Sequence, residues 1–297
     1  MTKYEALESK RRELYEEYKK ENKIGTIAIF IAVALFLIGY LLEAVLMIFV
    51  LLAIVAIVVA VVFFGKASSI NNKYRTFVKT ELVDKVLSTY FEVYSYTEKS
   101  HVPIAVANGA GLMQTPDRSY GEDLITGKYK NIEFAVSDLK FEERQVVRTK
   151  NGTYVRYVPY FTGRWYVYKF PKKLEHTLKI VESSMGVNTR GMKKYETEMI
   201  EFNKKFNIYS SDQSFFFQLI NPYMIERLLL LEQAHRGKIS YAFINDELHI
   251  AVNDGSNSLE LSFKKEINQA NIIHFEEDIK LIKDIVDEFY LDDVKFR

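Results

Sequence analysis

The sequence contains no cysteine, and it also lacks the common catalytic motifs. Without thiols the chain can form neither disulfides nor thiolate metal sites, which suits a cytoplasmic domain. The five histidines are dispersed, and no two lie three or four residues apart as they would in a HExxH zinc motif. The segment Asn108-Gly109-Ala110-Gly111 is glycine-rich, but it lacks the Lys-Ser/Thr pair of a phosphate-binding loop. We therefore expect no catalytic residues, no metal and no cofactor.

Charge is almost absent from a run of about forty apolar residues between Ile24 and Phe64. One straight helix of this length would reach roughly 60 Å, about twice the hydrocarbon thickness of a bilayer. A break at Gly39-Tyr40 divides the run into two segments, each close to the ~20 residues that one crossing needs. The pattern predicts a transmembrane helical hairpin over residues 24–64, with Glu43 at the far interface, because only helices satisfy their backbone groups in lipid.

The turn of this hairpin has no Lys or Arg, whereas Lys19, Lys20 and Lys23 precede the first span and Lys66, Lys73 and Arg75 follow the second. The positive-inside rule then predicts a multi-pass membrane protein with both termini in the cytoplasm. A cleaved signal peptide is not expected, because the apolar run is too long and begins after a long charged segment.

Acidic residues are scarce in the middle of the chain. Only Glu175 and Glu182 oppose twelve Lys and Arg between Arg144 and Lys194, while residues 246–293 are rich in Asp and Glu. A net charge of +1 hides this asymmetry. Aromatic residues are interleaved with the cations, which is typical of surfaces that bind anions. The residues expected to form this contact face are Arg144, Arg148, Arg156, Arg164, Lys169, Lys172 and Lys173.

The residues before the hairpin predict a charged cytoplasmic helix over 1–23, opened by a capping box at Thr2–Glu5. Tyr4, Leu7, Leu14 and Tyr18 form a short seam on this helix, interrupted by Arg11. The seam either packs on its own chain or pairs with another copy. A juxtamembrane helix and linker are expected over 65–100, followed by a soluble domain over 101–297.

Strand patterns dominate the first part of the soluble domain. Asn151-Gly152 lies between two alternating segments, 145–149 and 154–160, and predicts a β-hairpin. Further strands are expected at Thr177–Glu182 and Glu196–Phe202, and residues 101–121 are expected to form a loop.

Helices and a second hairpin follow. Asn221-Pro222 is a typical helix start, and the segments Ile239–Phe243 and Leu248–Val252 predict a hairpin. A last helix is expected from Glu276 to about Tyr290. This order predicts an α+β fold: a mainly antiparallel sheet with flanking helices, preceded by the transmembrane hairpin.

Four stretches resemble a bacterial family of membrane proteins known only as a domain of unknown function. They are the charged helix with its two-span hairpin, the segment Gly121–Tyr129 running into Ile132-Glu133-Phe134, the segment Tyr160–Arg164, and Glu201–Ser210 followed by Asn221–Leu228. The family pattern more often has threonine at the position of Asn221. The resemblance implies a cytoplasmic α+β domain tethered to the bacterial inner membrane, without an established activity.

The leading hypothesis is a non-enzymatic, membrane-anchored module that binds through its basic, aromatic-rich sheet. Its partner would be anionic lipid head groups or a membrane-associated protein, and the membrane tether makes nucleic acid the less favoured anion. Neutralisation of the basic residues by Asp284, Asp287 and Glu288 of the last helix is a competing interpretation. Two alternatives stay open: an enzyme with a site near Glu122, Asp123 and His101, and a self-associating structural protein.

Overall fold

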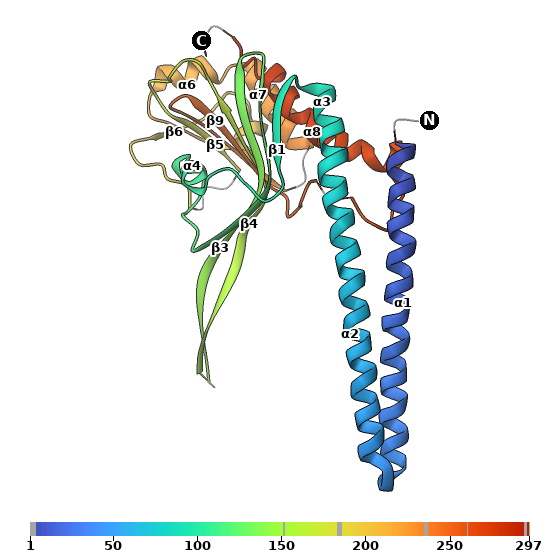
Figure 1. Cartoon of the computed structure of the whole chain (residues 1–297). Coiled ribbons are helices and arrows are strands. Elements are labelled where there is room, and N and C mark those ends of the chain that lie inside the picture. The colour runs from blue at the N-terminus through green and yellow to red at the C-terminus, as the bar shows by residue number, and fades with distance from the viewer. Residues whose placement is uncertain are drawn as a thin grey trace. The chain divides into compact units, whose positions relative to one another are not determined.

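The computed structural model describes residues 4–150, 152–182, 186–234, 237–259, 261–293 and 296 (Figure 1). The chain divides into two compact units. The first unit is formed by Met1–Val83 together with Glu260–Phe275, and the second by Asp84–Leu259 together with Glu276–Arg297. The first unit therefore includes a returning segment, Glu260–Phe275, which lies in the sequence between two parts of the second unit.

Two long helices form most of the first unit, shown in blue to cyan in Figure 1. Helix α1 spans Glu5–Leu41, a short 3-10 turn covers Glu43–Val45, and α2 spans Leu46–Phe77. A π turn, Val78–Leu82, continues α2 into α3, Val83–Tyr90. The expected charged helix is continuous with the first apolar span, because Glu, Lys and Arg are good helix formers and no Gly-Pro break separates the two. The predicted capping box pairs Thr2 with Glu5, and Thr2 lies outside the described residues.

Small residues repeat at seven-residue intervals on the facing sides of α1 and α2. Gly25, Ala32 and Gly39 are buried on α1, and Ala53, Ala60 and Ala67 are buried on α2. The two helices approach closely there: a Cβ placed on Gly25 would lie 2.9 Å from the ring of Phe64, and one on Gly39 would lie 2.6 Å from Cβ of Phe49. Small residues let the backbones of two apolar helices approach closely, so that van der Waals packing can hold the helices together in an apolar environment.

The large apolar side chains of both helices point outward. Only 22% of the most apolar window of α1 and 11% of that of α2 are buried. A core helix of a soluble protein would bury this surface. Both helices are long and apolar enough to cross a membrane.

The charged end of α1 binds the returning segment of the same unit. Arg11 is buried, donates from Nη1 to the carbonyl oxygen of Phe263 (3.0 Å), and pairs with Glu8 (2.7 Å). Glu8 in turn accepts a hydrogen bond from the backbone N–H of Ile267 (2.7 Å). The Phe263 ring stacks on Tyr74 of α2 with centroids 4.3 Å apart. The seam residues Tyr4, Leu7 and Leu14 are buried, and Tyr18 contacts Phe263, so the seam packs on its own chain.

The second unit is built around a nine-stranded sheet of order β1-β2-β3-β4-β9-β8-β5-β7-β6. Its strands are β1 (Val93–Thr97), β2 (Arg118–Tyr129), β3 (Ile132–Thr149), β4 (Gly152–Lys169), β5 (Leu178–Val181), β6 (Lys193–Tyr195), β7 (Asn207–Ser210), β8 (Lys238–Ile244) and β9 (Glu247–Asn253). Every neighbouring pair is antiparallel. The second unit also contains the helices α4 (Ile104–Gly109), α5 (Ile200–Lys205), α6 (Gln213–Leu219) and α7 (Pro222–Ala234). Helix α8 (Gln269–Glu288) begins in the returning segment of the first unit and belongs to the second unit from Glu276 on. The predicted α+β class is confirmed.

Successive side chains of β4 point alternately into two apolar layers, one on each face of the sheet. Phe161 and Trp165 face the cluster that includes Ala107 and Ala110 of the α4 segment. Tyr168 points to the opposite face, where its hydroxyl donates to the carbonyl oxygen of Ile282 on α8 (3.0 Å). Both faces of the central strands are therefore buried.

Several predicted elements are confirmed. The segments around Asn151-Gly152 form the β3–β4 hairpin, although Asn151 itself lies outside the described residues. Asn221 caps α7 by accepting from the backbone N–H of Met224 (2.9 Å). Strands β8 and β9 pair across Asn245, which has a positive φ of 55°.

Three local predictions are wrong. Glu196–Phe202 does not form a strand, because Asn203 binds the backbone N–H and carbonyl of Thr197 and turns the chain into α5. The expected loop at 101–121 contains α4 and the first residues of β2. Helix α8 begins at Gln269, earlier than expected.

Candidate interaction surface

The distal parts of β3 and β4 form a two-stranded extension of the sheet, which we call the basic hairpin (residues 143–150 and 152–158). Figure 1 shows it in green, projecting beyond the body of the sheet. Arg144, Arg148, Lys150 and Arg156 are exposed on it, and Glu143 is its single acidic residue among those described. Three of the predicted contact residues therefore lie on one projecting element.

The two faces of the basic hairpin carry different cations. The register pairs Arg144 with Tyr157 and Gln145 with Arg156, so Arg144 and Arg148 share one face and Arg156 lies on the other. The guanidinium of Arg156 donates to Gln145 (2.9 and 3.1 Å), not to a carboxylate. Both faces have exposed apolar or aromatic side chains, namely Val146, Tyr154 and Val155.

Arg118 joins the face of Arg144, although the predicted basic stretch does not include it. Its guanidinium carbon lies 3.3 Å from the ring centroid of Tyr157, a close cation–π contact. The residue is on β2, whose pairing with β3 brings it beside the base of the hairpin. A count of charges along the sequence cannot detect this, because the contact joins segments far apart in the chain.

Arg164 is not on the surface, which corrects its inclusion in the predicted contact face. Its side chain is 4% exposed and pairs through Nε with Asp138 (3.0 Å), which is 8% exposed. Burial by itself would lower the pKa of Arg164, but the neighbouring Asp138 carboxylate outweighs this and raises the pKa above its ordinary value. Nη1 and Nη2 of Arg164 have no hydrogen-bond partner among the described residues.

Lys169, Lys172 and Lys173 are exposed, but they lie at or beyond the opposite end of β4 from the hairpin. Because a strand rises ~3.3 Å per residue, Lys169 is roughly 40 Å along β4 from Arg156. Lys169 lies 3.6 Å from Asp246, and the pocket lined by Lys172 and Lys173 also contains carboxylates. The seven predicted residues are therefore divided into an exposed group on the hairpin, a buried arginine and a distant, partly compensated group.

The acidic residues of α8 pair with other cations. Asp284 binds Lys280 (2.6 Å), Asp287 binds Lys130 and Lys283 (2.7 and 2.9 Å), and Glu288 binds Arg227 (2.6 Å). None of these partners belongs to the basic hairpin. The competing interpretation, in which α8 neutralises the basic stretch, is not supported by these pairs.

The three residues of the alternative enzyme site do not all line the cavity at Glu122. Asp123 is buried at a β-bulge with a positive φ of 62°, and it accepts a hydrogen bond from the hydroxyl of Tyr96 (2.6 Å). Glu122 instead lines a cavity of about 280 Å³ and binds the side chain of Asn257 (2.7 Å). His101 is not among the residues of that cavity. The bulge directs the two adjacent acids to different surroundings.

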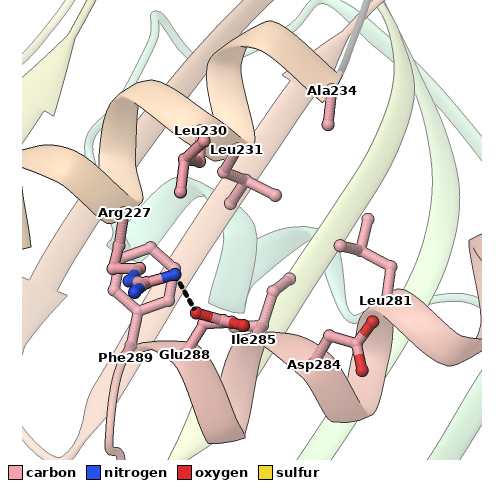
Figure 2. Close-up of a pocket in the computed structure, with 9 residues that line it drawn as sticks. All are labelled: Arg227, Leu230, Leu231, Ala234, Leu281, Asp284, Ile285, Glu288 and Phe289. Carbon is pink, nitrogen blue, oxygen red and sulfur yellow. Dashed lines mark ion pairs between the residues drawn. The ribbon is translucent and has the colours of Figure 1, made fainter.

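A groove of about 200 Å³ lies between α7 and α8. Figure 2 shows Leu230, Leu231 and Ala234 on α7 opposite Leu281 and Ile285 on α8. The Arg227–Glu288 ion pair bridges the two helices at one end of the groove. Its lining is mostly apolar, and among the described residues no group of three or more His, Cys, Asp or Glu side chains is arranged to hold a metal.

Comparison with known proteins gives a family without an assigned function. Residues 160–291 match the family described as "Protein of unknown function (DUF3137)". The match includes Glu201–Ser210 and Asn221–Leu228, the most specific stretches of the resemblance noted from the sequence.

Among solved structures, the chain is similar to the mycobacterial trehalose monomycolate transport factor A, TtfA. The identity is 7%, the TM-score is 0.40, and the alignment covers 71% of this chain and 95% of that chain. This likeness is too low to carry an argument about function. No curated protein matches the chain.

Proposed function

We propose that this protein is a membrane-anchored module whose basic hairpin binds the anionic head groups of the bilayer that anchors it. Helices α1 and α2 cross the membrane, and both termini are on the cytoplasmic side. The observation that carries the proposal is the hairpin itself: it projects from the sheet and exposes four cations that have no acidic partner among the described residues.

The energetic argument rests on the tether. Each Lys or Arg close to an anionic leaflet contributes ~1 kcal/mol, and the effect decays within a Debye length of ~8–10 Å. A free protein must overcome several kcal/mol of lost translational and rotational freedom on binding, whereas an anchored domain has already lost most of it. A few cations are then sufficient to hold the hairpin at the surface.

The side chains between the cations fit the same partner. Tyrosine is enriched where a membrane meets water, because its ring is apolar and its hydroxyl is polar. Tyr154 is 52% exposed on the hairpin, and Val146 and Val155 are also exposed. A hairpin with cations and exposed apolar side chains on both faces can lie in the head-group region with either face toward the lipid.

The absence of cysteine makes a direct test simple. A single Thr153→Cys variant, labelled with an environment-sensitive fluorophore, would report contact of the hairpin with lipid in the full-length protein in nanodiscs. We expect a blue shift in nanodiscs containing phosphatidylglycerol, little shift in pure phosphatidylcholine, and loss of the shift at 1 M salt, where the Debye length falls to ~3 Å.

Two controls separate this from a general effect of the membrane. The same label at Ser95→Cys on β1, an exposed site away from the hairpin, should not respond to lipid charge. In the Thr153→Cys background, the triple change Arg144→Gln, Arg148→Gln and Arg156→Gln should abolish the response. Equal spectra in neutral and anionic nanodiscs would exclude head-group binding by the hairpin.

A further inference from the structure

A second binding site is suggested by a cavity of about 280 Å³ on the α4 face of the sheet. Its floor includes Ser240 on β8 and Ala251 on β9, which are directly paired in the register. Because these two paired side chains are small, they leave space above the sheet at this point. Leu112 and Met113, from the segment after α4, together with Phe161 of β4, supply apolar walls.

Most polar groups of the lining already have partners. Asn253 accepts from the backbone N–H of Thr162 and donates to the carbonyl oxygen of Tyr160. The Tyr160 hydroxyl donates to the carbonyl oxygen of Gln114 (2.7 Å), and the side chain of Gln114 donates to Glu143 (3.1 Å). These groups therefore shape the cavity and are not available to a ligand without cost.

Lys238 and Ser240 differ from these groups, because neither side chain has a hydrogen bond or ion pair with any residue that the structure describes. Lys238 is two residues from Ser240 on β8, so both side chains point to the same face. The nearby Glu182 carboxylate accepts from the backbone N–H of Ile239 and attracts Lys238 electrostatically, without an ion pair between the two side chains. An ammonium and a hydroxyl are thus available at one part of a cavity whose other polar side chains are hydrogen-bonded to one another or to the backbone.

We propose that this cavity binds a small monocarboxylate with an apolar body. The carboxylate accepts hydrogen bonds from the Lys238 ammonium and the Ser240 hydroxyl, and the apolar body packs against Leu112, Met113 and Phe161. A single cation, with the Glu143 carboxylate also in the lining, suits a monoanion better than a phosphate dianion. The volume admits roughly nine groups of the size of a water molecule, which limits the ligand to about ten non-hydrogen atoms.

The test uses full-length protein with ¹³C-methyl methionine in neutral phosphatidylcholine nanodiscs, so that anionic head groups do not attract the cations of the basic hairpin. The chain has seven methionines, and the resonance of Met113 is assigned with a Met113→Leu variant. The probes are phenylacetate and its uncharged analogue phenylacetamide. We expect a saturable shift of the Met113 methyl with phenylacetate, and at least tenfold weaker binding of phenylacetamide because the charge-assisted hydrogen bonds are lost.

Two matched lysine variants test whether the carboxylate of phenylacetate binds at Lys238. Lys238→Met should weaken phenylacetate binding about tenfold, while Lys128→Met, which removes an exposed lysine from β2, should leave it unchanged. Both lysines are exposed, so neither change should prevent folding. The proposal is overturned if Met113 does not respond, if both probes bind equally, or if the two variants weaken binding to the same extent.

Discussion

Strand β4 carries two arginines in opposite environments. Arg156 is exposed on the basic hairpin and donates only to Gln145, whereas Arg164, eight residues further along, is buried against Asp138. The sequence around them is similar, since each arginine is flanked by aromatic and apolar residues. The difference comes from the strands beside them: two strands form the hairpin, but β3, β4 and β9 together bury Arg164. A basic stretch in a sequence is therefore not yet a basic surface.

The largest expected effect comes from breaking the buried pair. Arg164→Met leaves Asp138 charged and buried without its cation, which costs about 3–5 kcal/mol of folding free energy. The matched change Arg156→Met on the same strand should alter stability by less than about 0.5 kcal/mol. Thermal unfolding followed by fluorescence of Trp165, the single tryptophan of the chain and fully buried, measures both variants.

The double variant Arg164→Met with Asp138→Leu provides the control for this comparison. Removing both charges avoids an unpaired carboxylate, so most of the loss should be recovered. If the double variant were as unstable as Arg164→Met alone, the pair would not be the cause. Equal loss in Arg156→Met and Arg164→Met would contradict the distinction between the two regions of β4.

A second comparison concerns buried and exposed lysines. Lys179 is buried on β5, and its ammonium donates to the carbonyl oxygens of Gly111 (3.0 Å) and Asn188 (2.8 Å). Burial lowers the pKa of Lys179 to about 8. Because the pKa of the unfolded chain stays near 10.5, the unfolded state binds more protons between these values, and stability should rise with pH in this window.

Between pH 7 and pH 10 Lys179 should add about 2–3 kcal/mol of stability to the wild type relative to Lys179→Met, whereas Lys172→Met, at an exposed site, should follow the wild type. Melting temperatures at intervals from pH 7 to 10 provide the measurement. From about pH 9 an opposite trend begins, because tyrosines of the unfolded chain ionise with a pKa near 10. Burial raises the pKa of Tyr160 to about 12, so ionisation of tyrosine in the unfolded state then lowers stability. If the wild type and Lys179→Met changed in parallel between pH 8 and 10, Lys179 would not be destabilised by its surroundings.

The distinction between local and long-range interactions also separates the features that the sequence predicts from those that it does not predict. The apolar helices, the β3–β4 and β8–β9 hairpins and the Asn221 cap depend on neighbouring residues, and all were predicted. The Arg11–Phe263 contact joins residues about 250 positions apart, and no local pattern reports it. The same applies to the burial of Arg164 by Asp138 and to the position of Arg118 over Tyr157. The candidate surface was therefore predicted only where it coincides with a local hairpin.

Shortening the basic hairpin is expected to have the smallest effect on stability. It also separates most sharply the basic hairpin from the part of β4 that lies within the sheet. Arg144 and Tyr157 are directly paired, so residues 145–156 can be replaced by an Asn-Gly turn without changing the register of the sheet. The removed ladder is exposed and lies outside the core cluster around Trp165, so the melting temperature should change by no more than a few degrees. The cation–π contact of Arg118 with Tyr157 is kept. Sedimentation of the shortened full-length protein with lipid would give no readout, because the proposed membrane anchor, α1 and α2, is kept. The readout is instead a fluorophore at Ser119→Cys, beside Arg118, whose response to anionic lipid should be lost with the hairpin.

If shortening lowered the melting temperature by more than about 10 °C, the hairpin would be a structural part of the sheet and not a separate contact element.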